Sequence, residues 1–319
     1  MNQPCEATTS ISGRNPVDLN VDQTYEAIAL NKQPNPTHAY IKVPDVGSRW
    51  VALSCGQLSN TIITANTPQP VSRPTNTVSS RFLPFFDNIN NPVNVKVGGR
   101  KDLTPLPPQL NDFDKAMNQI CGEVGTVVSP DSFKEKLREF PDVLTNIRET
   151  VGNSLVDGRT ADDDFIDDLT DIWFNAHGFD HVFCGEPGQN NIGGLHFVGR
   201  YLDLQQKGVA GRLPNADNRA EVEDGAIYTL GVEMKVGDRI VKAPIKGYGY
   251  TLNAEDILAI AAKAYKDNPN TESTSKGCTL TITDDGKTFA NVFVAKNGAI
   301  RTFFPDATPD FNRNGECNS

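Results

Sequence analysis

The sequence predicts an α+β protein: a small β-rich N-terminal module, then a larger domain of helices followed by two antiparallel β-sheets. Three observations predict this. Apolar residues recur at helical spacing from about Asp112. Beyond Gly178 they alternate at strand spacing, interrupted by Gly-Asp, Asp-Gly and Asn-Gly turns. A proline-rich segment separates the two parts, and 319 residues are enough for two or three domains.

The N-terminal module is expected over residues 1–65, where apolar side chains alternate near Tyr40 and Trp50 between turn residues. The chain has six dispersed cysteines and no C-x-x-C pair. Disulfides and an oxidising compartment are therefore favoured over six buried thiols. Cys5 with Cys55 is the preferred pair, closing the module, and Cys278 with Cys317 is the next.

A linker or an extended wrapping segment is expected over residues 66–111. Eight of the 21 prolines fall between residues 66 and 110, which excludes long regular elements there. The larger domain is then expected over residues 112–319, with a core at 160–319.

Helices are expected first in the larger domain, at 131–139 and 142–151 on either side of Pro141. Another should follow Thr160 as its N-cap, with Asp163 placed as in a capping box. A later helix should begin at the N-cap Asn253 and pack against the sheets. The expected strands are Ile227–Met234, Arg239–Ala243, Leu280–Thr283, Phe289–Ala295 and Ala299–Phe304.

The charge distribution argues against a protein that wraps duplex nucleic acid. The net charge is −10 and the pI about 4.9. Residues 1–180 carry 15 basic and 23 acidic side chains, a balance of −8, and residues 181–319 carry 15 and 17, only −2. Binding of a short single-stranded RNA at one or two nucleotides is compatible with this balance. No apolar run approaches the roughly 18 residues of a membrane helix.

Three of the four histidines, His177, His181 and His196, lie within 20 residues. Two imidazoles are what phosphodiester transesterification needs: one takes the proton of the 2′-hydroxyl and the other protonates the leaving 5′-oxygen. A lysine can offset charge on the phosphorane. Two neighbouring histidines are also compatible with a structural or metal-binding role.

The surrounding string extends that interpretation. Gly-Phe-Asp-His-Val-Phe-Cys-Gly-Glu over 178–186 and Gly-Gly-Leu-His over 193–196 resemble the paired-histidine motif of the EndoU endoribonucleases. The histidines are 196 − 181 = 15 positions apart, as in the similar nidoviral uridylate-specific enzyme. The resemblance covers about residues 160–319. It implies an EndoU-like fold, His181 as general acid, His196 as general base, and the Gly194 amide as a ligand of the scissile phosphate.

The family's third catalytic group is a lysine on a strand before a helix. Lys246, seven residues before the cap Asn253, fits that context. Lys242 is the alternative, because strand alternation would place it on the same face as Lys246, and Lys235 lies on the same stretch.

The resemblance also implies residues that recognise the base. Thr302 and Phe304 lie in the family's final hairpin, where the last aromatic stacks on base or ribose; a core position of a terminal strand is the alternative for Phe304. Viral relatives select uracil with a serine or threonine four residues after the lysine. Here that place holds Tyr250, with Thr251 beside it.

These residues together predict an endoribonuclease that cleaves single-stranded RNA at uridines and leaves 2′,3′-cyclic phosphate and 5′-hydroxyl ends. Asp180 and Glu186 match acidic positions of the motif, where they orient His181 or attract manganese that enhances activity. No organic cofactor is expected. The expected location is secreted or periplasmic, a signal segment having been removed or never present, and an inhibitor or immunity protein is a candidate partner.

Two other functions compete with this prediction. One is a metal-dependent hydrolase with His177, Asp180, His181 and Glu186 as ligands, although Gly178 discourages the helix that the His-x3-His spacing would need. The other is a non-catalytic secreted binding protein on an EndoU scaffold. Metal content, activity in chelator, and cleavage of a uridine-containing oligonucleotide separate the three.

Overall fold

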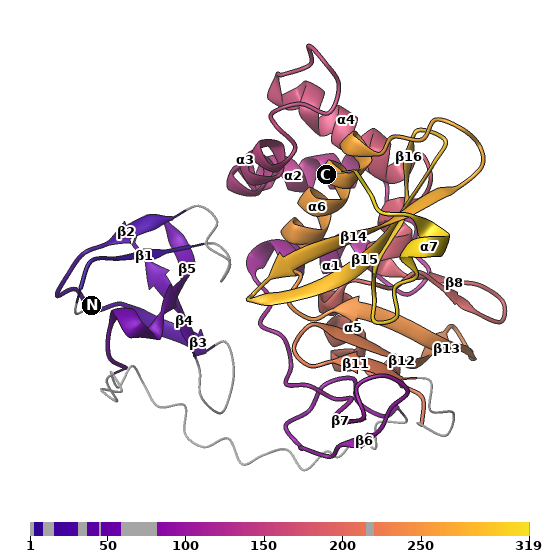
Figure 1. Cartoon of the computed structure of the whole chain (residues 1–319), viewed down its shortest axis with the longest axis horizontal. Helices are drawn as coiled ribbons and strands as arrows, with labels where there is room; N and C mark the ends of the chain where they lie inside the picture. The colour runs from indigo at the N-terminus through magenta and orange to yellow at the C-terminus, as the bar shows by residue number, and fades with distance from the viewer. Residues whose placement is uncertain are drawn as a thin grey trace. The chain divides into compact units, whose positions relative to one another are not determined.

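The computed structural model describes residues 3–8, 16–30, 37–44, 46–58, 82–214 and 220–318 (Figure 1). The chain divides into two compact units, which are described separately. One comprises Met1–Ser80 with Asp284–Gly286, and the other Arg81–Thr283 with Lys287–Ser319. The predicted α+β class with a small N-terminal β module is confirmed. None of the helices described is long and apolar enough to cross a membrane.

The N-terminal unit consists of short antiparallel strands. β1 (Cys5–Ala7) pairs with β2 (Val17–Leu19), and β3 (Glu26–Leu30), β4 (His38–Val43) and β5 (Gly47–Ala52) form a three-stranded sheet followed by the 3₁₀ turn η1 (Leu53–Cys55). Alternation places Ala39, Ile41 and Val43 in a small core. The predicted Cys5–Cys55 disulfide closes this unit and stabilises its small core.

Helices occupy the first half of the larger unit. They are α1 (Asp112–Cys121), α2 (Pro130–Glu139), α3 (Pro141–Thr150) and α4 (Asp162–Phe174). The Asn111 capping box begins α1, and proline at the first position begins both α2 and α3. The prediction of Thr160 as the cap of α4 was wrong, because the chain enters the helix at Ala161 with no side-chain cap.

The second half was expected to be strands with one helix, and two stretches of it differ. Residues Asp180–Cys184 form a π-helical turn, η2, and Val198–Gln206 form helix α5. The helical spacing of buried residues in α5 is hard to recognise in the sequence, because glycines lie on both sides of the helix and Gly199 lies within it. The Asn253 capping box begins α6 (Ala254–Asp267), as predicted, and the short α7 (Phe311–Asn314) lies near the C-terminus.

Two antiparallel sheets complete the unit. In one, β12 (Ile227–Val236) pairs with β10 (Ala210–Arg212), β11 (Glu221–Glu223) and β13 (Arg239–Gly249). The other has the order β14 (Lys276–Asp284), β15 (Lys287–Lys296), β16 (Ala299–Asp306). Two-stranded pairs are β6 (Val93–Asn94) with β7 (Arg100–Lys101), and β8 (Glu186–Pro187) with β9 (Ile192–Gly193).

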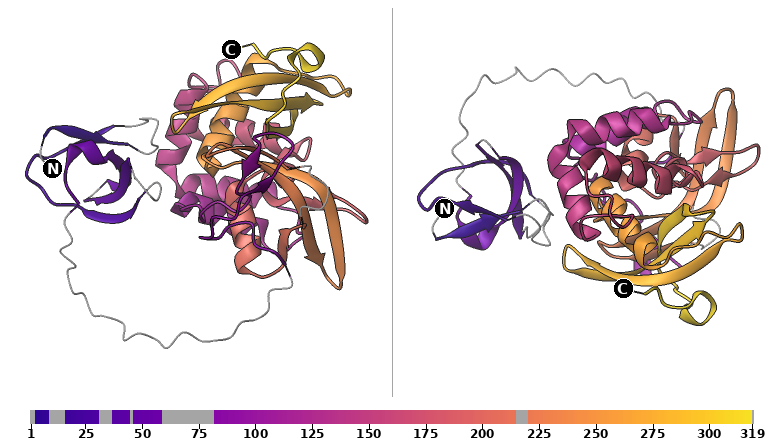
Figure 2. Two further views of the ribbon diagram at one scale, coloured as in Figure 1. Left: turned by 60° about the horizontal axis from the view of Figure 1, so that its bottom comes forward. Right: turned by 90° about the horizontal axis from the view of Figure 1, so that it is seen from above.

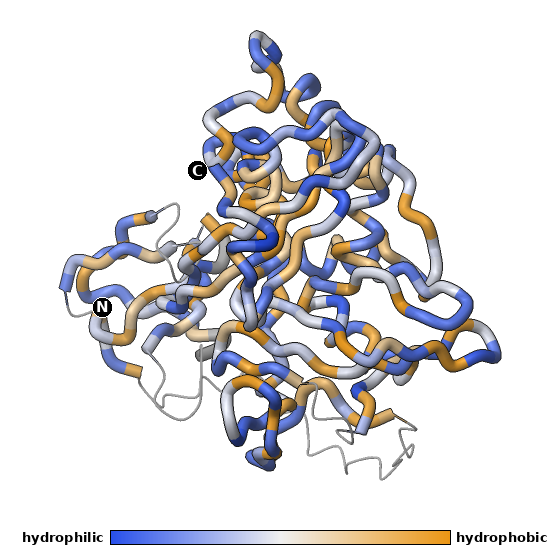
Figure 3. Tube along the Cα trace, turned by 45° about the vertical axis from the view of Figure 1, so that its right-hand side comes forward, coloured by the Kyte–Doolittle hydropathy of each residue, from blue (hydrophilic) through white to orange (hydrophobic). Residues whose placement is uncertain are grey.

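Helix α6 joins the layers of this unit. It packs against α1 and α3 on one side and against β15 and β16 on the other, while β13 contacts β16 where the two sheets meet (Figure 2). Hydrophobic and hydrophilic residues are interspersed along the chain (Figure 3). A single large core therefore runs from the helices through both sheets.

Part of the proline-rich segment belongs to this core. Residues 66–81 lie outside the described residues. Beyond them, Phe85, Phe86 and Leu103 are buried in the core of the larger unit. The side chain of Gln205 accepts from the amides of Phe85 and Phe86 and donates to the Phe86 carbonyl at 2.9 Å. Residues 82–111 therefore wrap along the larger unit.

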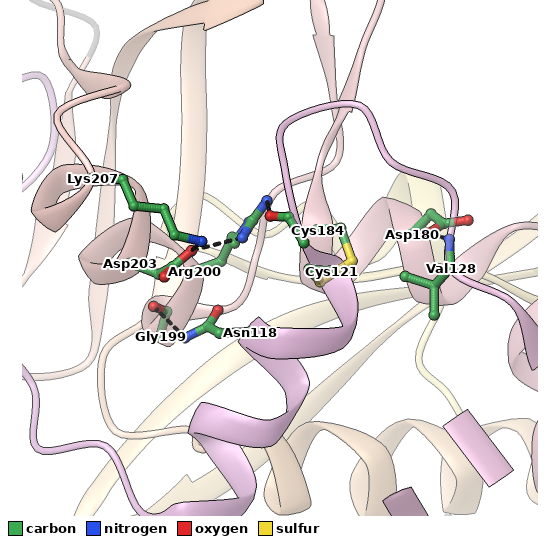
Figure 4. The surroundings of a disulfide bond; sticks show 10 residues. Asn118, Cys121, Val128, Asp180, Cys184, Gly199, Arg200, Asp203 and Lys207 are labelled. Atoms are coloured by element: carbon green, nitrogen blue, oxygen red, sulfur yellow. Dashed lines mark hydrogen bonds and ion pairs between the residues drawn. A yellow bond between two sulfur atoms is a disulfide. The ribbon is translucent and has the colours of Figure 1, made fainter. Parts of the chain in front are cut away.

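Two further disulfides stabilise the larger unit, Cys121–Cys184 and the predicted Cys278–Cys317. Cys121–Cys184 joins the end of α1 to the π-helical turn (Figure 4). The amide of Val128 reinforces this link by donating to Asp180 at 3.0 Å, also in Figure 4.

Removing Cys121–Cys184 by a double serine substitution should lower the free energy of unfolding by about 4 kcal/mol, the loop-closure value for a sequence separation of 63. Cys278→Ser/Cys317→Ser, which opens a separation of 39, is the matched control and should cost a similar amount. Only the first change should also lose amide-exchange protection at residues 180–184. Equal protection in both variants would show that the disulfide does not hold the turn.

Candidate active site

Four predicted residues come together where the π-helical turn, β13 and β16 meet. The ring centroids of His181, in η2, and His196 lie 5.7 Å apart. Phe304 of β16 stacks on His196 at 5.2 Å, with 27° between the ring planes. The charge of Lys246 on β13 lowers the pKa of His196, so its ammonium group acts on the same site. Residues distant in sequence thus share one location.

The turn that carries His181 is held closely against β16. His177 has a left-handed backbone (φ 57°), and its carbonyl accepts from the His181 amide at 3.1 Å. A Cβ on Gly178 would lie 2.2 Å from the carbonyl oxygen of Ile300, so only glycine fits there. Together, these contacts fix where the π-helical turn begins.

The Gly-Gly-Leu-His segment binds along the same turn. The amides of Leu195 and His196 donate to the carbonyls of His181 and Val182 at 2.7 and 2.8 Å. Gly194 has φ 58°, and a Cβ there would lie 1.7 Å from the His181 carbonyl oxygen. Glycine at this position therefore allows the two histidine segments to approach each other. That its amide binds a phosphate stays a prediction.

A carboxylate orients His181. The Nδ1–H of His181 donates to Glu186 Oε2 at 2.5 Å. Arg301 donates to both oxygens of Glu186, at 3.2 and 2.9 Å. Burial alone would raise the pKa of Glu186, but the hydrogen bonds from His181 and Arg301, together with their charges, lower it to about 2. Glu186 is therefore an anion that accepts the Nδ1–H of His181, which leaves Nε2 of His181 for a ligand.

His196 is held in its neutral form. Its Nδ1–H donates to the carbonyl of Gly247 at 2.8 Å, which fixes the tautomer with the lone pair on Nε2. Burial lowers the pKa of His196 to about 3; the Gly247 hydrogen bond opposes this, and the charges of His181 and Lys246 add to it. His196 is therefore neutral near pH 7 and able to accept a proton.

The two candidate lysines lie on opposite faces of β13, so the expectation of a shared face was wrong. On β12, Leu230 pairs with Lys246 and Val232 with Ala243, so β13 holds one extra residue in a β-bulge. The bulge reverses the alternation: Lys242 lies 3.6 Å from Glu233 on the outer face. Burial lowers the pKa of Lys246, and nearby Glu186 raises it. Lys235 lies on the face of Glu233, away from Lys246.

The four expected base-recognition residues occupy different environments. Thr251 and Thr302 each have a buried hydroxyl oxygen that has no hydrogen-bond partner in the described part of the protein. The hydroxyl of Tyr250 instead donates to the carbonyl of Leu106 at 2.7 Å. Phe304 keeps part of its surface exposed beside His196. Within the described ranges, the hydroxyls of the two threonines thus have no partner, whereas Tyr250 supports the wrapping segment.

The residues considered as metal ligands do not form a metal-binding site. In the described ranges, no group of three or more His, Cys, Asp or Glu side chains is arranged to hold a metal ion. Asp180 accepts the Val128 amide, whereas both oxygens of Glu186 bind Arg301 and His181. Burial raises the pKa of Asp180, which is opposed by the Val128 hydrogen bond. This donor set does not fit a resident manganese ion, and it argues against the metal-dependent hydrolase.

Sequence reasoning missed Arg301. It is the extra residue of a bulge in β16, between Ile300, which pairs with Ala295, and Thr302, which pairs with Val294. Its neighbours Thr302 and Phe304 were recognised from the closing hairpin, but nothing in the pattern indicated that this arginine reaches Glu186.

Comparison with known proteins gives a match to one part of the chain, the part that carries these residues. Residues 175–307 match the family described as bacterial EndoU nuclease. No curated protein matches the chain. Among solved structures, the chain is similar to the endoribonuclease Nsp15 encoded by Middle East Respiratory Syndrome Coronavirus, with 12% identity and a TM-score of 0.37. That match covers 87% of this chain and 59% of the viral chain.

Proposed function

We propose, from the match of residues 175–307 to the family described as bacterial EndoU nuclease, that the protein is an endoribonuclease that cleaves single-stranded RNA at uridines. The observation that supports the proposal most strongly is a pair of rings 5.7 Å apart with different partners: His181 binds the carboxylate of Glu186, and His196 binds the carbonyl of Gly247. A pair of groups with one proton donor and one acceptor is what the reaction requires.

The reaction proceeds by attack of the RNA on itself. Nε2 of His196 takes the proton of the 2′-hydroxyl, and the 2′-oxygen forms a bond to phosphorus. The bond from phosphorus to the 5′-oxygen breaks, and Nε2–H of His181 protonates that leaving oxygen. Lys246 offsets the negative charge of the phosphorane. The products are a 2′,3′-cyclic phosphate and a 5′-hydroxyl, and no step passes through a metal.

Uridine selection is proposed to come from the surfaces beside His196. Phe304 offers a ring face for stacking, and Thr302 on the same strand, whose buried hydroxyl has no hydrogen-bond partner among the described residues, is the proposed polar contact for the base. The three disulfides of the described chain are typical of an oxidising compartment. We therefore propose a secreted or periplasmic enzyme, for which an inhibitor or immunity protein is a candidate partner.

Dinucleotide cleavage tests this function directly. UpA, CpA, ApA and GpA are incubated with the enzyme in EDTA, together with a UpA whose uridine lacks the 2′-hydroxyl. We expect UpA to be cleaved fastest, with cyclic phosphate as the product, and the deoxy analogue to resist. Cleavage that stops in EDTA and returns with manganese would support the metal-dependent hydrolase instead. An intact UpA would indicate a binding protein.

The acid side of the pH profile is a second test. Because the pKa of His196 is lowered to about 3, this group stays neutral and able to accept a proton well below 6.5. Activity should fall only when pH approaches the lowered pKa. We expect the acid midpoint of kcat/KM on UpA to lie at least about 1 pH unit below 6.5. A midpoint at 6.5 or above would contradict the proposed state of His196.

Substitution of Phe304 tests the stacking surface. Phe304→Ala should lower kcat/KM on UpA by about 10- to 100-fold, the loss expected for roughly 1–3 kcal/mol of stacking. Phe304→Tyr keeps the ring, so its kcat/KM on UpA should stay close to the wild-type value. If Phe304 is only a core residue, alanine lowers the melting temperature and leaves kcat/KM of the folded enzyme unchanged.

A further inference from the structure

We propose that Arg301 is a positioning residue for the cleavage reaction, acting on the general acid His181 through the carboxylate of Glu186. The inference rests on the function proposed above and adds to it a residue outside the two histidines and the lysine. It follows from the contacts of Arg301, from the bulge that carries it and from the turn on which it rests.

The guanidinium of Arg301 binds Glu186 as a fork. Nη1 donates to Oε1 at 3.2 Å, and Nη2 donates to Oε2 at 2.9 Å. Oε2 is also the acceptor of the His181 Nδ1–H at 2.5 Å. Two parallel hydrogen bonds fix both the place and the plane of a carboxylate. The plane of Glu186 in turn sets the direction in which the His181 ring points its Nε2.

The bulge in β16 gives Arg301 a second set of contacts. Nη1 lies 3.3 Å from the carbonyl oxygens of Ala176 and His177, and it donates to both. The His177 carbonyl also accepts the amide of His181. Gly178 allows this turn to lie directly against Ile300, the residue before Arg301. Arg301 is thereby fixed to the beginning of the segment that carries the general acid.

Stabilisation of the fold is a minor role for this pair. The side chains of Arg301 and Glu186 are 32% and 31% exposed, and ion pairs with this much exposure contribute little to stability. The His181 side chain is only 15% exposed, so its orientation depends on the protein rather than on water. Loss of Arg301 should therefore affect the direction of the acid more than the stability of the enzyme.

A leaving group that needs no proton separates this role from others. With UpA, Arg301→Ala should lower kcat by roughly 10- to 100-fold, with KM within about threefold of the wild type. Uridine 3′-(4-nitrophenyl phosphate) releases nitrophenolate without the help of an acid. On this substrate the kcat of Arg301→Ala should therefore stay within about threefold of the wild-type kcat. Arg301→Lys should recover part of the loss on UpA, and so should guanidinium ion added to Arg301→Ala.

Two further measurements complete the test. Glu186→Gln should lower kcat on UpA, and adding Arg301→Ala to it should cause little further loss, since both act through one contact. The downfield proton resonance of His181 Nδ1–H should be present in the wild type and weakened in Arg301→Ala, which is informative even at low activity. Arg138→Ala, which removes an exposed ion pair with Asp163, is the matched arginine control. It should change neither kcat on UpA nor the His181 resonance.

Several results would overturn the proposal. A rise in KM with kcat retained would make Arg301 an RNA-binding residue, and an equal loss on both substrates would make its role structural. Unchanged kcat on UpA and an unchanged resonance would remove any role. The proposed function itself fails if the wild type leaves UpA intact, or if His181→Ala lowers kcat equally on UpA and on the nitrophenyl substrate. This inference then fails with it.

Discussion

His196→Ala and His181→Ala are each expected to lower kcat on UpA by about 10³- to 10⁴-fold, because each removes one proton transfer from the transition state. The double variant should be little worse than either single variant, since the two groups act as a unit. Steady-state rates on UpA give these values. His38→Ala, in the N-terminal unit, is the matched histidine control and should retain full activity.

The nitrophenyl substrate distinguishes the two histidines from each other. His181→Ala should cleave it nearly as fast as the wild type, since nitrophenolate needs no proton. His196→Ala should remain impaired on it, because the 2′-hydroxyl still has to be deprotonated. The reverse pattern would exchange the two roles. If His181→Ala and His196→Ala both kept wild-type activity on UpA, the mechanism would be excluded.

Lys246→Ala should lower kcat on UpA by about 10²- to 10³-fold, the usual loss when one group that stabilises developing charge is removed. Lys242→Ala is the control that the structure provides. Lys242 lies on the outer face of the same strand, beside Glu233. It should keep wild-type kcat, and Lys246→Arg should recover part of the alanine loss. Comparable losses in Lys242→Ala and Lys246→Ala would contradict the placement made by the bulge.

The parts of the fold that follow a regular period were predictable from sequence. Helix α6 was expected at its cap Asn253 because a capping box is a local signal. The final hairpin was expected at Asn297-Gly298, where Asn297 takes the left-handed conformation that such turns need. The π-helical turn was missed, because its geometry depends on Gly178 and Gly194 approaching other segments rather than on the period of its own residues.

The site residues that lie in a sequence motif were predictable, whereas the positions of those that depend on a β-bulge were not. His181, His196 and Glu186 lie in one recognisable string, and the structure brings them together. The face of Lys246 and the reach of Arg301 depend on β-bulges in β13 and β16. One extra residue reverses every side chain after it, and no residue type marks where it occurs.

The central claim is that two imidazoles act on opposite sides of one phosphodiester, and a crystal structure with 2′-fluoro-2′-deoxy UpA tests it most directly. The account predicts the scissile phosphate between the rings, with Nε2 of His196 about 3 Å from the 2′ substituent and Nε2 of His181 about 3 Å from the 5′-oxygen. A dinucleotide bound elsewhere, or with both oxygens beside the same histidine, would contradict it.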